Sequence, residues 1–138
     1  MKKYLNISLF YAIAAMVGGV FYREFTKFNG FDSATALGKV HTHLFILGMI
    51  VFLIVALFVS RNNSVPKHKC FKAFMVTYNT GVILTAIMML ARGTIQVLGI
   101  GLAKGIDAAI SGVAGIGHIL TGAGIILLLL SLIKTAKN

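Results

Sequence analysis

The chain has 138 residues, of which 58% are hydrophobic and only 12% are charged. Soluble domains carry about a quarter charged residues, so this composition excludes an ordinary soluble domain and indicates a membrane protein. The single cysteine, Cys70, excludes an internal disulfide and any cysteine-rich metal site.

The net charge is +10, from 13 Lys and Arg against 3 Asp and Glu. In a soluble protein such an excess of bases would indicate nucleic-acid binding. Here the bases lie at the chain ends and between hydrophobic runs, where basic residues anchor helices and set their orientation. We therefore expect no nucleic-acid partner, and we expect membrane lipid around the chain.

Four hydrophobic runs reach the roughly 20 residues that an α-helix needs to cross the hydrocarbon layer. In chain order they are residues 4–22, 40–60, 71–91 and 108–132. The sequence thus predicts an all-α fold: an integral membrane four-helix transmembrane bundle that forms one domain over residues 1–138.

The distribution of bases predicts the orientation of this bundle. Eight of the thirteen bases lie at the two chain ends and in the loop between the second and third runs. The other side holds five bases and all three acids, Glu24, Asp32 and Asp107. Because cytoplasmic loops are enriched in Lys and Arg, both termini are predicted to be cytoplasmic.

Three histidines fall inside the predicted spans, where ionisable groups are costly and each is a functional-site hypothesis. His41 and His43 lie 20 and 18 residues before Arg61, and His118 lies 16 residues before Lys134. At 1.5 Å per residue they are roughly 30, 27 and 24 Å from the inner boundary. All three are therefore close enough in depth to bind one planar cofactor.

His41 and His43 cannot both face that cofactor, because side chains two residues apart on a helix point about 200° apart. Gly48 lies on the same side as His41 and would offer a flat face to a large ring, which favours His41, whereas depth favours His43. Small residues flank His118 on its own face. In membrane helices such residues more often indicate close helix packing, but beside a histidine we interpret them as a cofactor surface. They are Ser111, Gly115, Thr121 and Gly122.

Two imidazoles on facing helices suit haem b with bis-histidine ligation. Zinc sites usually have about four protein ligands, or three protein ligands and a water molecule. Copper could use His41, His43 and a methionine, but the six methionines are scattered and fit packing better. Without paired carboxylates, a Ser/His/Asp set or a phosphate loop, a hydrolytic enzyme is not expected.

Two arginines lie at the outer boundary, Arg23 after the first run and Arg92 after the third. Either could hold a haem propionate through charge-assisted hydrogen bonds. The alternative is that both simply anchor helices at the interface. Tyr78 shares a helix face with Arg92 and is added to the candidate cofactor contacts.

The segment VHTHLFILG, residues 40–48, resembles the second helix of subunit I of the haem-copper oxidase and nitric oxide reductase superfamily. In that family a histidine of this segment and one on a later helix ligate a low-spin haem. The resemblance implies His41 and His118 as axial ligands, and haem propionates near Arg23 and Arg92. The copper-site histidines of the family have no counterpart. The whole chain also resembles a small, uncharacterised four-helix family of bacterial membrane proteins, a domain of unknown function. This second resemblance implies a place in the inner membrane of a bacterial cell.

We therefore expect a b-type haem protein for electron transfer, with His41 and His118 as the axial pair and His43 as the substitute or as a ligand at a second site. The Gly-rich fourth helix predicts a homodimer, and the partner would be a respiratory-chain protein or quinol. If the protein is an enzyme, it is an oxidoreductase. Two alternatives stay open: a haem or copper handling factor for assembly of a respiratory complex, and a helper subunit without cofactor.

Overall fold

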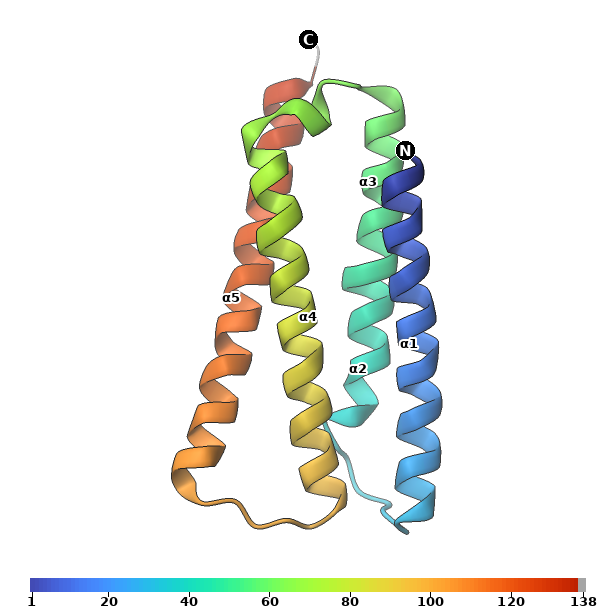
Figure 1. Cartoon of the computed structure of the whole chain (residues 1–138), viewed down its shortest axis with the longest axis vertical. Helices are drawn as coiled ribbons and strands as arrows, with labels where there is room; N and C mark the ends of the chain where they lie inside the picture. Colours follow the sequence, from blue (N-terminus) through green and yellow to red (C-terminus); the bar gives the residue numbers. More distant parts are fainter. Residues whose placement is uncertain (137–138) are drawn as a thin grey trace.

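The computed structural model describes residues 1–136, most of which are helical (Figure 1). Its elements are α1 (Lys2–Phe28), α2 (Leu37–His43), η1 (Leu44–Ile50), α3 (Val51–Arg61), η2 (Val65–Lys67), α4 (Lys69–Val97) and α5 (Lys104–Thr135). The π-helix η1 joins α2 and α3 into one continuous span, and η2 is a single 3₁₀ turn. This part of the chain contains no strand.

Four helical spans of 27, 25, 29 and 32 residues are long and apolar enough to cross a membrane. This agrees with the four predicted spans and indicates a multi-pass membrane protein. Each span begins earlier and ends later than its apolar run. The helices continue into flanking polar residues because i to i+4 backbone hydrogen bonds do not depend on hydrophobicity.

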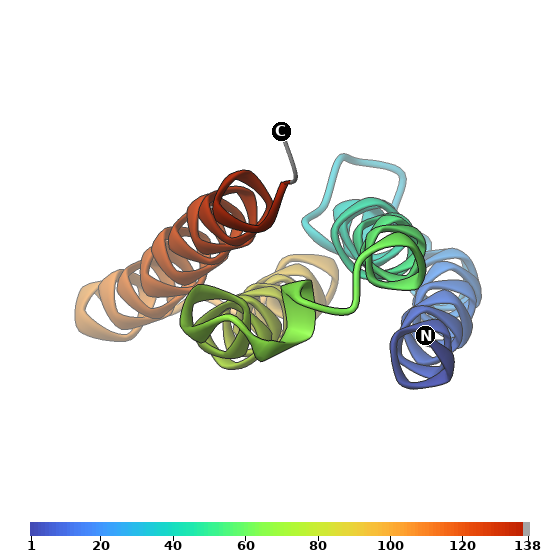
Figure 2. The same ribbon diagram turned by 90° about the horizontal axis from the view of Figure 1, so that it is seen from above.

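The four spans form two helix pairs, and the bundle is open on one side (Figure 2). The second span packs along α1, and α5 packs along α4, while α4 also packs on α2 and η1. The start of α1, the end of α5 and η2 lie at one end, here called the terminal end, and the other two connections lie at the distal end. Viewed along the helices, α5 stands on the far side of α4 from α1.

Small residues bring α4 and α5 into close contact. A Cβ placed on Gly81 of α4 would lie 2.5 Å from the backbone nitrogen of Thr121, and one on Gly117 of α5 would lie 2.6 Å from Oγ1 of Thr85. Membrane helices associate through such positions because small residues let the backbones approach. This contact fixes the rotation of α5 about its own axis, and with it the direction of His118.

Buried aromatic rings fill the space between α1, α3 and α4. The ring centroids of Tyr11 and Phe52 are 5.8 Å apart, those of Phe52 and Phe74 are 5.9 Å apart, and those of Phe74 and Tyr78 are 5.2 Å apart. Aromatic pairs at this spacing stabilise a core beyond the area that they bury. The cluster ties the two helix pairs together.

Polar contacts at the distal end fix the start of the second span against α4. The hydroxyl of Thr35 donates to the carbonyl of Gly93 (3.1 Å), and the backbone N–H of Ala36 donates to Oε1 of Gln96 (2.8 Å). Gly93 is itself required here, since a Cβ would overlap the backbone nitrogen of Leu37. The histidines that follow in α2 therefore sit at a defined height beside α4.

Replacing Gly81 by Ala tests the α4–α5 contact. The added methyl group would overlap the backbone of Thr121, and overpacking of this kind costs about 1–3 kcal/mol. We expect Gly81→Ala to lower the free energy of unfolding in detergent, followed by circular dichroism. Gly112→Ala is the control, because a Cβ there meets nothing within 4 Å and Ala is the better helix former. Equal effects of the two substitutions would contradict the packing described.

Candidate functional site

The rings of His43 on α2 and His118 on α5 lie next to each other. Their centroids are 6.4 Å apart and their planes meet at 85°. His43 is partly buried and His118 is exposed. The structure thus brings together two histidines from spans that otherwise have little contact.

Each of these rings is held by a hydrogen bond to its own helix. Nδ1 of His43 donates to the carbonyl oxygen of Lys39, and Nδ1 of His118 donates to that of Ala114, both at 2.9 Å. Since a carbonyl can only accept, the proton of each neutral ring is on Nδ1, and Nε2 keeps its lone pair. Metal-binding histidines commonly have this arrangement, because the second hydrogen bond orients the ring.

His41 is arranged differently and contacts α1. A Cβ on Gly19 would lie 3.6 Å from its Cβ and Cγ, and its ring is stacked on that of Tyr22 with centroids 6.4 Å apart. Nδ1 of His41 is buried and has no hydrogen-bond partner within residues 1–136. We expected the ring of His41 beside His118, but the structure places the ring of His43 there. Positions two apart on α2 face different neighbours, so His41 faces α1 instead.

The spacing of His43 and His118 fits one metal ion between two imidazoles. Metal–nitrogen bonds are roughly 2.0–2.1 Å, and a ring nitrogen lies about 1 Å from its centroid, so two rings on opposite sides of one metal have centroids about 6 Å apart. The observed 6.4 Å agrees with this distance. Within residues 1–136, no three His, Cys, Asp or Glu side chains gather as a metal site. The copper set would also need His41 and His43 together, yet these rings face different helices.

The surface around the pair is open and has few side chains on the α5 side. Gly115 and Gly122 lie one turn to either side of His118, and a Cβ added to either glycine would meet nothing within 4 Å. On α2, His43 lines a shallow groove of about 210 Å³ with Thr42, Ile46 and Leu47. A flat group bound between the rings could therefore extend over the glycines of α5.

Gly48 and Tyr78, both expected to contact a cofactor, are instead part of the core. A Cβ on Gly48 would overlap the ring of Tyr11, so the flat face of this glycine is occupied by α1. The Tyr78 side chain is fully buried, and its hydroxyl donates to the carbonyl of Leu47 (2.8 Å). Gly48 does share a side with His41, as the periodicity predicts, but that side faces α1.

The π-helix begins directly after His43, and side chains from two other helices stabilise it. Its wider turn leaves carbonyls without their usual partners. Tyr78 of α4 donates to Leu47, and Ser8 of α1 donates to the carbonyl of Met49 (2.8 Å). Single π turns occur frequently at functional sites. Here the turn changes the register of the span beyond His43 and lets Gly48 meet Tyr11.

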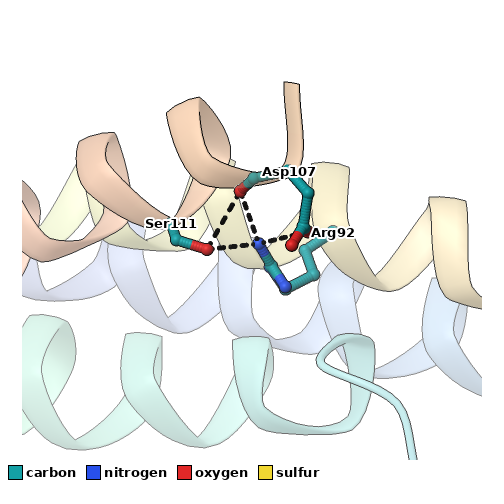
Figure 3. Close-up of polar contacts among 3 residues, drawn as sticks. All are labelled: Arg92, Asp107 and Ser111. Atoms are coloured by element: carbon teal, nitrogen blue, oxygen red, sulfur yellow. Dashed lines mark hydrogen bonds and ion pairs between the residues drawn. The ribbon is translucent and has the colours of Figure 1, made fainter. Parts of the chain in front are cut away.

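Arg92 joins α4 to α5 through Asp107 and Ser111 (Figure 3). One terminal nitrogen donates to Oδ1 and to the backbone carbonyl of Asp107 (3.0 and 3.2 Å) and to Oγ of Ser111 (2.8 Å). Ser111 precedes His118 by seven residues, which places it about 10 Å nearer the distal end on the same helix face. The guanidinium therefore lies near the face of α5 that carries His118, held by an ion pair that the sequence pattern did not indicate.

Arg23, the other candidate for an anionic group, is not brought to this face. It lies on α1, its side chain is 79% exposed, and its nearest charged partner is the adjacent Glu24 at 3.5 Å. Since α1 packs on the second span and α5 packs on α4, Arg23 fits the alternative role of an interfacial anchor.

The fold and this site define a small helical protein of the multi-pass membrane type with a two-histidine contact between spans. A family model described as "Protein of unknown function (DUF2871)" matches residues 1–135, so the chain belongs to this family. No curated protein and no solved structure matches the chain. The predicted resemblance to an uncharacterised family is thus confirmed, whereas the link to the haem-copper oxidases stays a prediction.

Proposed function

We propose that this protein is a membrane-embedded b-type haem protein in which His43 and His118 are the axial ligands. The observation that carries the proposal is the facing pair, with both Nδ1 atoms bonded to backbone carbonyls and both Nε2 atoms free. A haem needs only two protein ligands because the porphyrin supplies the other four, whereas zinc and copper sites need more. Haem bound in this way exchanges single electrons.

The neighbouring residues support this choice of cofactor. Gly115 and Gly122 leave the α5 side of the pair free of side chains, as a wide planar ring requires. Arg92 would hold a propionate, since its guanidinium bonds Ser111, which lies about two helical turns from His118 on the same face of α5, and charge-assisted bonds to carboxylates are strong. His41 has no ligand role in this proposal.

Substitution of each histidine tests the assignment. In protein expressed with ample haem and purified in detergent, we expect about one haem per chain and a sharp reduced α-band that carbon monoxide leaves unchanged. His43→Ala and His118→Ala should lose most of the haem or keep a haem that binds carbon monoxide, because an axial position is then open. His41→Ala is the matched control and should keep the original spectrum.

Restoration by imidazole separates ligation from folding. Free imidazole should restore the six-coordinate spectrum of His118→Gly, since it can occupy the space that the side chain leaves. A His118→Ala protein with full haem content and a spectrum insensitive to carbon monoxide would contradict the proposal.

A haem-handling role is the second candidate, favoured by the exposure of His118 and the open groove beside His43. Such a protein would hold its haem weakly. Transfer of the haem to apomyoglobin within minutes would support handling, and retention over hours would support electron transfer.

We also propose that the terminal end faces the cytoplasm of a bacterial cell, because most of the bases lie there. Cys70, the single cysteine, lies at the start of α4 near that end and is a natural reporter. A membrane-impermeant maleimide should label Cys70 only after the membrane is opened. A cysteine in the distal loop, Asp32→Cys combined with Cys70→Ser, should be labelled from outside; the reverse pattern would contradict this orientation.

A further inference from the structure

A second cleft opens between α1 and α4, away from the pair of His43 and His118. It has a volume of about 270 Å³ and opens toward the outside of the helix bundle. Its walls are mostly apolar, with an amide at each side and one phenol. The residues that line it are Asn6, Ile7, Phe10, Tyr11, Asn79 and Ile83.

The amide of Asn79 has donor capacity left over in this cleft. Its Oδ1 accepts a hydrogen bond from the hydroxyl of Tyr11 (2.9 Å), and its Nδ2 donates to the carbonyl of Met75 (2.7 Å). A carboxamide carries two N–H groups, and the second finds no acceptor within residues 1–136. Tyr11 is 2% exposed and stacked on Phe52, so the amide that it bonds is held in place.

The free N–H of Asn79 is unusual because of its depth along α4. Asn79 lies ten residues after Lys69, about 15 Å from the start of α4, and Tyr11 lies about 14 Å from the start of α1. This depth is inside the hydrocarbon of a bilayer whose core is about 30 Å thick. Water and the ester carbonyls of lipids lie nearer the surface, and a polar group without a partner in hydrocarbon is strongly unfavourable.

The cleft therefore suits a flat, lipid-soluble molecule that carries a carbonyl acceptor. Its volume is below the roughly 300–1,000 Å³ of pockets for whole drug-sized ligands, so a single ring system fits better than a haem. Phe10, Ile7 and Ile83 provide apolar walls, and an attached hydrocarbon tail could leave into the lipid through the opening. We propose that this cleft binds the head group of a membrane quinone, with the free N–H of Asn79 donating to a quinone carbonyl.

This site is independent of the haem, because it lies between α1 and α4 while the histidine pair lies between α2 and α5. Its test uses two probes of the same shape, 2-methyl-1,4-naphthoquinone and 2-methylnaphthalene, in equilibrium dialysis against the full chain in lipid nanodiscs. Empty nanodiscs correct for partition into lipid. We expect saturable binding of the quinone and none of the hydrocarbon, which lacks the carbonyls.

Two variants and a control locate the binding. Asn79→Leu should weaken quinone binding at least tenfold, and so should Ile83→Phe, which fills the cleft from its lipid-exposed wall without removing the Tyr11–Asn79 hydrogen bond. Thr80→Leu, an exposed neighbour outside the cleft, should bind as the parent does. Circular dichroism checks the fold of each variant.

Other results would overturn the proposal. Equal binding of quinone and methylnaphthalene would show an apolar crevice for lipid chains. Quinone binding unchanged in both Asn79→Leu and Ile83→Phe would place the ligand elsewhere, and a switch in oligomeric state on Ile83→Phe alone would assign the cleft to a second copy of the chain.

Discussion

The structure depends on one constraint: backbone and side-chain polar groups in an apolar setting must find partners inside the protein. Regular helices meet this constraint for most of the chain. Where the second span departs from α-helix at Leu44–Ile50, hydroxyls from α4 and α1 take up carbonyls of the wider turn. The same constraint orients the site, because His43 and His118 each bond a carbonyl of their own helix and so direct Nε2 away from it.

The two histidines come from different helix pairs. The second span belongs to one helix pair, with α1, and α5 belongs to the other, with α4. Small residues position α5 closely on α4, and the aromatic cluster around Phe52 joins the pairs through the middle. A metal held between His43 and His118 would join α2 to α5 directly, so cofactor binding and the stability of the open side of the bundle would be coupled.

Sequence reasoning captured the fold because hydrophobic length is a one-dimensional signal: four apolar runs bounded by bases are visible without knowledge of packing. It also identified the three histidines and their common depth. It favoured His41 as the histidine facing His118, because Gly48 was interpreted as a free flat face. The packing of Tyr11 shows that α1 covers that side, and the ring beside His118 is that of His43. The π turn has no sequence signature. Tyr78 and Arg92 share a helix face by periodicity, but Tyr78 bonds Leu47 of η1 whereas Arg92 bonds Asp107 of α5. The Arg92–Asp107 pair was not predicted, because it depends on how α5 folds back along α4 after their connection.

The central claim is that His43, and not His41, faces His118, and cysteine cross-linking in membranes tests it most directly. In a Cys70→Ser background, the double variants His43→Cys/His118→Cys and His41→Cys/His118→Cys would be treated with dibromobimane, which becomes fluorescent when both of its arms alkylate thiols. The account predicts strong fluorescence for the pair at positions 43 and 118 and none above the single-cysteine controls for the pair at 41 and 118. Fluorescence from the second pair alone would contradict it and would return His41 to the site.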